Sequence, residues 1–271
     1  MRWLWSGADG SIFGKYALDF TQLLKVAFPP NDSVMARNDK LPANTSSPTE
    51  LQAFLRKVAA TPVRVAPGER GRLIFALDAT ASRQPTWDQA CHLQAEMFAE
   101  TEALGGLDVQ LAYYRGFMDF QASDWTSRAH DLTRRMSGVQ CMAGETQIAK
   151  VLRHAVNETK RKRVNAVVFV GDCMEEDVDG LGKIAGELGL LGVPVFLFQE
   201  GQDVLAEFAF TQIARLTGGA HCRFNAGSAK MLRELLGAVA VFAAGGRKAL
   251  EDFATARGGA VLQIAHQMKR G

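Results

Sequence analysis

Three segments of the chain carry hydroxyl and carboxylate side chains beside predicted strands or helices. Asp78, Thr80 and Ser82 follow a short apolar run at alternate positions in "LDATAS". Asp172 follows a second apolar run in "VVFVGD", and Thr146 lies in "AGETQ", just before a predicted helix. All five side chains offer oxygen, the ligand atom that hard divalent cations such as Mg²⁺ prefer. Two carboxylates would neutralise one such ion, so these residues predict a divalent metal site.

The first of these segments also has an ordinary structural explanation. An aspartate at a strand end, followed by threonine and serine, often caps a helix or accepts backbone hydrogen bonds in a turn. A pattern as short as Asp-x-Thr-x-Ser also arises by chance. For this segment alone the structural explanation is the stronger one. The coincidence with Asp172, at the end of a second buried strand, favours the metal site.

Apolar strands alternating with amphipathic helices predict the scaffold that would hold these residues. Strands that are apolar throughout and separated by helices form a mostly parallel sheet covered on both faces. The predicted fold is therefore α/β, a Rossmann-like open sheet with one antiparallel edge strand and helices on both faces. In such folds ligands bind beyond the carboxyl ends of the strands, where the strand order reverses. The predicted strands are 73–77, 109–115, 117–122 (the antiparallel edge), 165–171, 194–199 and 220–225, and the helices are 86–104, 146–160, 180–191, 204–219 and 229–244.

The regions on either side of this pattern differ from it in composition. Residues 1–28 contain six aromatic side chains, which predicts that they pack against the domain or mediate self-association rather than form a free tail. Residues 29–48 are rich in Pro, Asn, Ser and Asp and predict a linker, after which a capping box opens a short helix. We therefore divide the chain into an N-terminal arm, linker and short helix (1–65), a central domain (66–244) and a C-terminal helical extension (245–271).

Composition restricts the class of protein. The chain of 271 residues has 47% hydrophobic and 22% charged residues, as ordinary globular proteins do. Its four cysteines form no CxxC pair, so neither a zinc ribbon nor a disulfide framework is predicted. The longest apolar run, 235–246, is about half as long as a membrane span, and the N-terminus lacks the apolar core of a secretory signal. We expect a cytoplasmic protein with no membrane contact.

The remaining charged segments and motifs carry weaker signals. The basic run "KRKR" (160–163) ends a predicted helix, where cations favour the helix dipole, and we expect a solvated terminus rather than nucleic-acid contact. The acidic run 172–180 is interpreted as a solvated loop whose last acids cap the helix near residue 180. No P-loop, GxGxxG, HExxH or GxSxG pattern occurs, so no catalytic or organic-cofactor-binding residue is predicted.

The segments "DATAS", "GET" and "VGD" resemble the metal-ion-dependent adhesion site (MIDAS) of von Willebrand factor A-type (VWA) domains. The order of elements over residues 70–244 is similar as well. The resemblance implies Mg²⁺ or Mn²⁺, rather than Ca²⁺, with hydroxyl groups as direct ligands and carboxylates that often act through water. Two positions depart from the pattern, because Thr80 stands where Ser is commoner and Cys173 where many relatives have Gly. The metal ligands implied are Asp78, Thr80, Ser82, Thr146 and Asp172.

The resemblance also implies a function. VWA domains of this kind are protein-interaction modules in which a partner's carboxylate commonly completes the metal site. We expect a non-catalytic, metal-dependent adaptor of the cytoplasmic bacterial type, whose partner is another protein, for example in a ring-shaped ATPase system. The alternative is a Mg²⁺-dependent phosphohydrolase that uses the same carboxyl-edge acids. No nucleophile–base pair and no phosphate-binding glycine-rich loop supports that alternative.

Overall fold

The computed structural model describes residues 49, 53–54, 56–58, 70–84, 106–224 and 229–257. All of them fall within Asn44–Gly271, the second of the two units into which the chain divides. The described residues between 49 and 58 are helical, as the capping box predicts. The aromatic arm, the linker and the predicted helix 86–104 lie outside the described residues, so their predictions stand untested.

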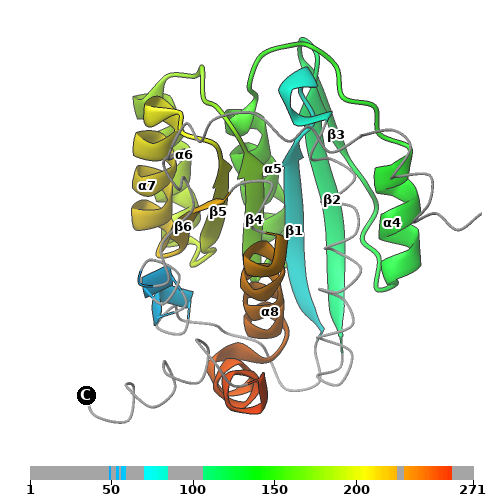
Figure 1. The fold of residues 1–271 in the computed structure, drawn as a ribbon, viewed down its shortest axis with the longest axis vertical. Coiled ribbons are helices and arrows are strands. Elements are labelled where there is room, and N and C mark those ends of the chain that lie inside the picture. Colours follow the sequence, from blue (N-terminus) through cyan, green and yellow to red (C-terminus); the bar gives the residue numbers. More distant parts are fainter. Residues whose placement is uncertain are drawn as a thin grey trace, which may run out of the picture. The chain divides into compact units, whose positions relative to one another are not determined.

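The described strands form a six-stranded sheet with the order β3-β2-β1-β4-β5-β6. β3 pairs with β2 in antiparallel orientation at one edge, and all other neighbours are parallel. This confirms the predicted α/β fold with one antiparallel edge strand (Figure 1). The strands are β1 (Gly71–Asp78), β2 (Leu107–Arg115), β3 (Asp119–Ala122), β4 (Ala166–Gly171), β5 (Val195–Glu200) and β6 (Ala220–Phe224).

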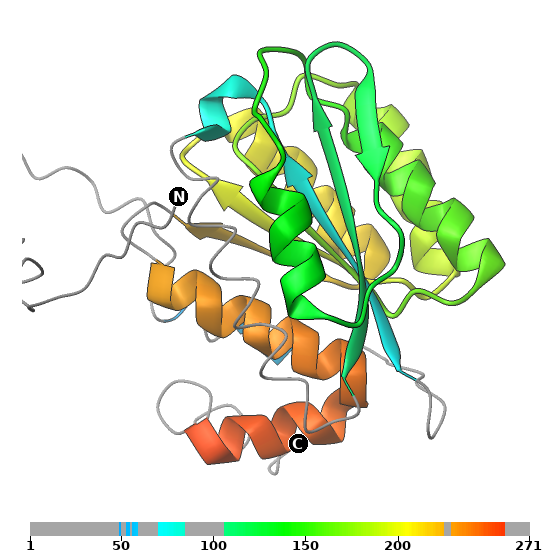
Figure 2. The ribbon, with the colours of Figure 1, turned by 90° about the vertical axis from the view of Figure 1, so that its right-hand side faces the viewer.

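Helices cover both faces of the sheet. Figure 2, in which the sheet is seen close to edge-on, shows α4 and α8 on one side and α5, α6 and α7 on the other. A short 3₁₀ turn, η1 (Ala81–Arg83), follows β1 directly. The helices are α4 (Ala129–Ser137), α5 (Ile148–Arg161), α6 (Val178–Leu190), α7 (Val204–Thr217) and α8 (Ala229–Arg257).

Alternation along the central strands produces two separate cores. In β1, Leu73, Phe75 and Leu77 join the core under α4 and α8, whereas Ile74 and Ala76 join the core under α5, α6 and α7. Successive side chains of a strand point to opposite faces, so a strand buried on both sides must be apolar at every position. This is why the strand predictions from continuous apolar runs agree with the structure.

One helix differs from the prediction, and the last helix has a break. α4 lies in a segment that was expected to be a loop, and its Leu132 and Met136 are buried one turn apart against the sheet. That apolar pair alone is short, and three arginines surround it in sequence. α8 consists of two helical parts separated by a break at Gly246, where φ is 71°, close to the predicted boundary between helix 229–244 and the C-terminal helical extension. Its first part packs so closely on β1 that a Cβ at Gly71 would lie 2.1 Å from the carbonyl oxygen of Ala243.

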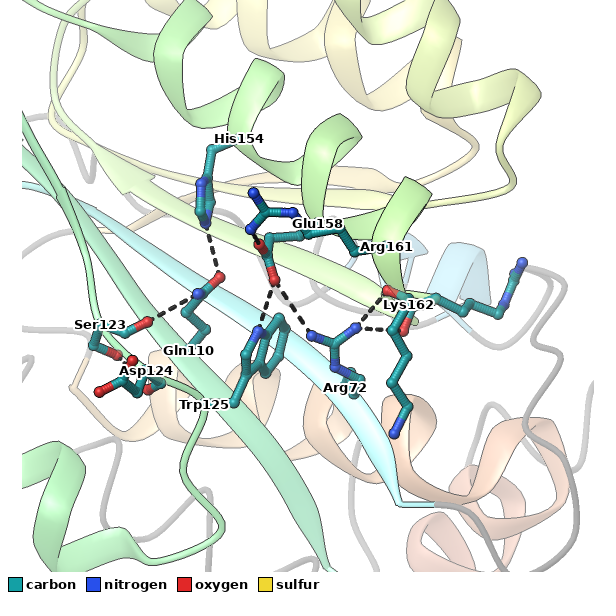
Figure 3. Close-up of polar contacts among 10 residues, drawn as sticks. Arg72, Gln110, Ser123, Asp124, Trp125, His154, Glu158, Arg161 and Lys162 are labelled. Carbon is teal, nitrogen blue, oxygen red and sulfur yellow. Dashed lines mark hydrogen bonds and ion pairs between the residues drawn. The ribbon is translucent and has the colours of Figure 1, made fainter.

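A buried polar cluster, which we call the Glu158 cluster, lies at the amino end of β1 and β4 (Figure 3). Glu158 of α5 accepts a hydrogen bond from the Trp125 indole at 2.8 Å and pairs with Arg161 at 3.0 Å and with Arg72 at 3.4 Å. The Arg72 guanidinium also stacks on the Trp125 ring at 3.7 Å and donates to the carbonyl of Lys162. The cluster therefore ties the start of β1, the segment after β3 and the end of α5 together.

Candidate metal centre

The two predicted acidic ligands lie at the point where the strand order reverses. Asp78 is the last residue of β1, and Asp172 directly follows β4, which is the neighbour of β1 in the sheet. The chain leaves β1 toward β2 on one side and leaves β4 toward β5 on the other. Diverging connections open a crevice at the carboxyl edge of a parallel sheet, which is where ligands bind in such folds.

Asp78 is fully buried and held by two hydrogen bonds. Its Oδ1 accepts from the backbone N–H of Thr80 at 2.7 Å, and its Oδ2 accepts from the Tyr114 hydroxyl at 2.9 Å. Burial raises the pKa of Asp78, these hydrogen bonds oppose the rise, and the negative charge of Asp172 adds to it. Burial also raises the pKa of Tyr114 well above its ordinary value, so this hydroxyl remains protonated and donates.

The hydroxyls of Thr80 and Ser82 face each other at an Oγ1–Oγ distance of 3.1 Å. Thr80 stands at the N-cap of η1, but its side chain makes no capping hydrogen bond there. Ser82 is exposed and Thr80 is buried, so the pair reaches from the interior of the edge to solvent. A purely structural role in the turn therefore explains Asp78 Oδ1, which accepts from the Thr80 N–H. It does not explain the hydroxyls of Thr80 and Ser82.

Asp172 is half-buried, and its Oδ1 is a buried atom without a hydrogen-bond partner. Carboxylate oxygens of Asp78 and Asp172 and the Cys173 sulfur lie within 4.8 Å of one another. Burial, followed by the charges of Asp172 and Asp78, raises the pKa of the Cys173 thiol to about 12, so this thiol is protonated at neutral pH. The carboxylates of Asp78 and Asp172 therefore lie close together, and Oδ1 of Asp172 has no hydrogen-bond partner among the described residues.

Thr146 joins the same edge through the segment that follows Asp172. Its Oγ1 accepts from the backbone N–H of Glu175 at 3.0 Å, and its own N–H donates to the Glu175 carboxylate at 3.1 Å. The neighbouring Glu176 accepts from the N–H groups of Ile148 at 2.5 Å and Ala149 at 2.9 Å, and so caps α5. This reciprocal set fixes the Thr146 loop against the Asp172 loop.

The interpretation of 172–180 as a solvated loop is wrong for Glu176, which is half-buried and caps α5, whereas Glu175 is exposed while it bonds Thr146. Asp177 does cap α6, as expected, by accepting from the N–H of Gly180 at 2.7 Å. The N-cap position of α5, Gln147, makes no side-chain capping bond of its own. The first N–H groups of a helix need acceptors, so the absence of a capping side chain at Gln147 indicates that an acid from another segment caps α5. The sequence does not show which acid this is.

A buried arginine that the prediction did not include lies at this edge. Arg83 forms an ion pair with Glu200 at the end of β5. Burial lowers the pKa of Arg83, and the negative charges of Asp172 and Asp78 oppose that shift. One guanidinium thus faces three carboxylates and is paired directly with Glu200. Among the described residues named at this edge, the single charge of Arg83 does not balance the three carboxylates of Asp78, Asp172 and Glu200.

These residues fit a hard divalent cation on three grounds. The five predicted side chains offer only oxygen. Ligands at adjacent octahedral positions around Mg²⁺, about 2.1 Å from the ion, lie roughly 3 Å apart, and the Thr80 and Ser82 hydroxyls are 3.1 Å apart. A buried carboxylate oxygen without a partner is costly unless a cation or water meets it.

Comparison with known proteins gives a result for the fold alone. No protein-family model matches the chain, and no curated protein matches it in sequence. Among solved structures, the VWA domain of SpRpn10 is similar with a TM-score of 0.50 and 12% identity, covering 62% of this chain and 94% of that domain. The pilus adhesin SpaC from Lactobacillus rhamnosus GG is similar with a TM-score of 0.51 and 9% identity, covering 71% of this chain and 31% of the adhesin.

The search for membrane-spanning helices gives a negative result within the described residues. None of the helices there combines the length and the apolar character that crossing a bilayer requires. The mostly parallel six-stranded sheet with one antiparallel edge strand belongs to the part of the chain that these similarities cover. The central part of this chain therefore has a VWA-like α/β fold.

Proposed function

We propose that this chain is a metal-dependent protein-interaction module. The observation that carries the proposal is the excess of negative charge at the carboxyl edge. Asp78 and Asp172 approach within 4.8 Å, the nearby Arg83 is paired with Glu200, and Asp172 Oδ1 is buried without a partner. A divalent cation would remove that excess and satisfy that oxygen.

The five predicted residues would share the coordination. Thr80, Ser82 and Thr146 supply hydroxyl oxygens, while Asp78 and Asp172 supply charge, directly or through water. Mg²⁺ and Mn²⁺ suit these small side chains better than Ca²⁺, which takes more ligands at longer distances. When bound, the ion supplies an electrophilic position that a carboxylate can occupy. Ser82 is exposed, so that position would face solvent and a partner could reach it.

The partner in this proposal is a protein that offers a carboxylate. Asp78 and Asp172 together offset the charge of one divalent ion, so attraction at long range is weak. The bond between a carboxylate and the metal is short and little screened, whereas charges around it are screened within about 8–10 Å at physiological salt. We therefore expect binding that requires the metal and is insensitive to moderate salt.

The wider role follows from the fold and from the chemistry of the edge. A VWA-like fold that occurs in a pilus adhesin supports an interaction role over catalysis. The Cys173 thiol, within 4.8 Å of the two acids, has a pKa of about 12 and is therefore a poor nucleophile at neutral pH. We propose a cytoplasmic, bacterial-type adaptor in a multi-protein system, of which a ring-shaped ATPase assembly is one example.

The proposal is tested by affinity capture from the native cell with the full chain as bait. Captures with Mg²⁺, with chelator, and with an Asp172→Asn bait in Mg²⁺ are compared by mass spectrometry. We expect a set of proteins that is retained only by the wild-type bait in Mg²⁺. Retention of the same proteins in chelator and by the Asp172→Asn bait would contradict a metal-dependent interaction.

A further inference from the structure

Three large apolar side chains are exposed together on two adjoining loops at the carboxyl edge. Phe117 and Met118, in the turn between β2 and β3, are 74% and 81% exposed, and Met142, in the loop before α5, is 49% exposed. We call these three residues the apolar ledge. Large exposed apolar side chains that cluster, rather than occur singly, mark interaction surfaces.

The apolar ledge is continuous in space. The N–H of Gly116 donates to the carbonyl of Met142 at 3.3 Å, which joins the two loops. A Cβ placed on Gly116 would lie 3.9 Å from the terminal methyl of Met142, so this side chain lies against the turn. The two loops thus adjoin, and each exposes large apolar side chains close to Gly116.

Backbone hydrogen bonds connect the ledge to the candidate metal centre. The N–H of Met142 donates to the carbonyl of Ala79 at 3.0 Å, and Ala79 lies between Asp78 and Thr80. The carbonyl of Met142 accepts a hydrogen bond from the N–H of Gly116, which begins the turn between β2 and β3. Neighbouring hydrogen-bonded segments lie about 4.8 Å apart, so the turn is roughly 10 Å from the Asp78–Thr80 segment.

The turn that carries Phe117 and Met118 is held firmly in place. Gln147 donates to the carbonyl of Gly116 at 3.2 Å, and the Lys150 amine donates to the carbonyl of Met118 at 3.1 Å. Gly144 passes so close that a Cβ there would lie 2.0 Å from the Gly116 carbonyl oxygen. Met118 has a φ of 61°, a conformation that side chains other than glycine rarely adopt. A rigid turn loses little entropy when it binds.

Charge beside the ledge favours an acidic partner. Lys150 is half-buried, and both of its hydrogen-bond partners, the Met118 carbonyl and Gln147 Oε1, are uncharged. Its positive charge also stabilises the charged forms of Asp119 and Glu176, and it adds to the attraction of a further carboxylate that approaches the edge. A divalent ion in the candidate centre would add a short-range bond to that carboxylate, because Asp78 and Asp172 offset its charge at longer range.

We infer that the apolar ledge is the second contact of the metal-dependent interface, and that the partner presents a carboxylate and a bulky apolar side chain on one extended segment. This inference rests on the proposed function, because the carboxylate is the group that reaches the metal. An extended segment advances about 3.3 Å per residue and places every second side chain on the same face. A span of roughly 10 Å therefore puts the apolar residue two or four positions from the acid.

The test is selection of a random-peptide display library on the full chain in Mg²⁺. We expect the selected peptides to share an Asp or Glu with an aromatic or large aliphatic residue two or four positions away. A synthetic peptide of that sequence is then measured by fluorescence anisotropy, together with versions in which the acid becomes its amide or the apolar residue becomes Ser. Wild-type chain should lose about tenfold in affinity for the Ser peptide.

The matched protein variants identify where the apolar residue binds. Phe117→Ser with Met118→Asn removes most of the ledge, and Asn tolerates the positive φ of position 118. This double variant should bind the apolar and Ser peptides with less than a twofold difference. Leu190→Ser is the control, because Leu190 is 92% exposed at the C-terminal end of α6 and outside the ledge. It should keep the tenfold discrimination.

The outcomes separate this inference from the proposed function. Peptides that require Mg²⁺ but bind the double variant as tightly as wild type would overturn the ledge and leave the metal-dependent module intact. Peptides that bind equally in chelator and to Asp172→Asn would overturn the proposed function itself. A wild-type dimer in sedimentation velocity that the double variant converts to monomer would also overturn the inference, since the ledge would then join two copies of this chain.

Discussion

Two buried acidic clusters lie at opposite ends of β1 and β4, and the chain treats them differently. In the Glu158 cluster, one carboxylate is surrounded by Arg72, Arg161 and the Trp125 indole, all within 3.4 Å (Figure 3). At the carboxyl edge, Asp78 and Asp172 approach each other within 4.8 Å, and the arginine beside them is paired with another acid. Within the part of the chain that the structure describes, the first cluster has two arginines for one acid, whereas the second has one arginine for three acids.

The pKa of Glu158 is lowered and that of Asp78 is raised, which agrees with the difference in counter-ions between the two clusters. Burial alone would raise the pKa of Glu158, but the hydrogen bond from Trp125 and the positive charges around it outweigh burial and lower this pKa. Burial raises the pKa of Asp78, and its hydrogen bonds do not outweigh burial. A buried acid with its own counter-ions stabilises the fold, whereas a buried acid pair without them indicates a binding site for a cation.

Removing Glu158, the acid of the Glu158 cluster, should give the largest loss of stability. Glu158→Ala leaves the buried Arg72 guanidinium without its carboxylate, and we expect the free energy of unfolding to fall by about 3 kcal/mol. Urea denaturation followed by circular dichroism measures this. Glu187→Ala is the control, because Glu187 pairs with Lys160 on the surface and should matter by less than about 1 kcal/mol. Equal effects of the two variants would show that the cluster is not the stabilising unit described here.

Removing one acid of the carboxyl edge should have a different effect, which depends on metal. In chelator, Asp172→Asn should be about as stable as wild type, because relief of the repulsion with Asp78 offsets the lost attraction to Arg83. In Mg²⁺ at about 100 times the dissociation constant, wild type should gain about 2.7 kcal/mol and the variant nothing. Urea denaturation with and without Mg²⁺ gives both numbers. A marked loss of stability for Asp172→Asn in chelator would assign Asp172 a structural role instead.

A smaller effect is expected when only the aromatic member of the Glu158 cluster is changed. Trp125→Phe removes the hydrogen bond to Glu158 and weakens the stacking of Arg72, but it keeps an apolar ring. We expect a loss of about 1–2 kcal/mol in urea denaturation, with Mg²⁺ affinity unchanged. A change in Mg²⁺ affinity would contradict the independence of the two clusters.

The pH dependence should show the sign of the Glu158 shift. Because the pKa of Glu158 is lowered on folding, its contribution is fully present above the ordinary glutamate pKa of about 4.3 and is lost as the pH falls through the lower folded value. The difference in unfolding free energy between wild type and Glu158→Gln should therefore be constant from pH 7 to about 5 and shrink below that. A difference that grows on acidification would reverse the assigned direction.

The sequence was informative wherever one strand or one helix determines the answer. Continuous apolar runs predicted the strands because each strand is buried on two faces, and the amphipathic pattern predicted α5, whose Ile148, Leu152, Ala155 and Val156 are all buried. α4 was missed because Leu132 and Met136 form too short an apolar pattern. The positions of the five predicted ligands on the chain were readable, and the fold does bring them to one edge; their metal binding remains a prediction.

Contacts that depend on strand register or on distant loops could not be read from the sequence. Tyr114 reaches Asp78 only because the two residues are paired in the β1–β2 register. Glu176 caps α5 from a loop nearly thirty residues away, and Arg83 meets Glu200 through the order of the strands. Sequence shows which groups exist, whereas the network that holds the edge depends on how the strands are arranged.

The central claim is that the carboxyl edge lacks one divalent cation. Isothermal titration calorimetry of the full chain with Mg²⁺ and with Mn²⁺, after removal of metal by chelator and dialysis, tests it most directly. We predict one site per chain that Asp78→Ala and Asp172→Asn each abolish, while Glu158→Gln binds as wild type does. Binding that persists unchanged in both aspartate variants, or no binding by a folded wild-type chain, would contradict the account.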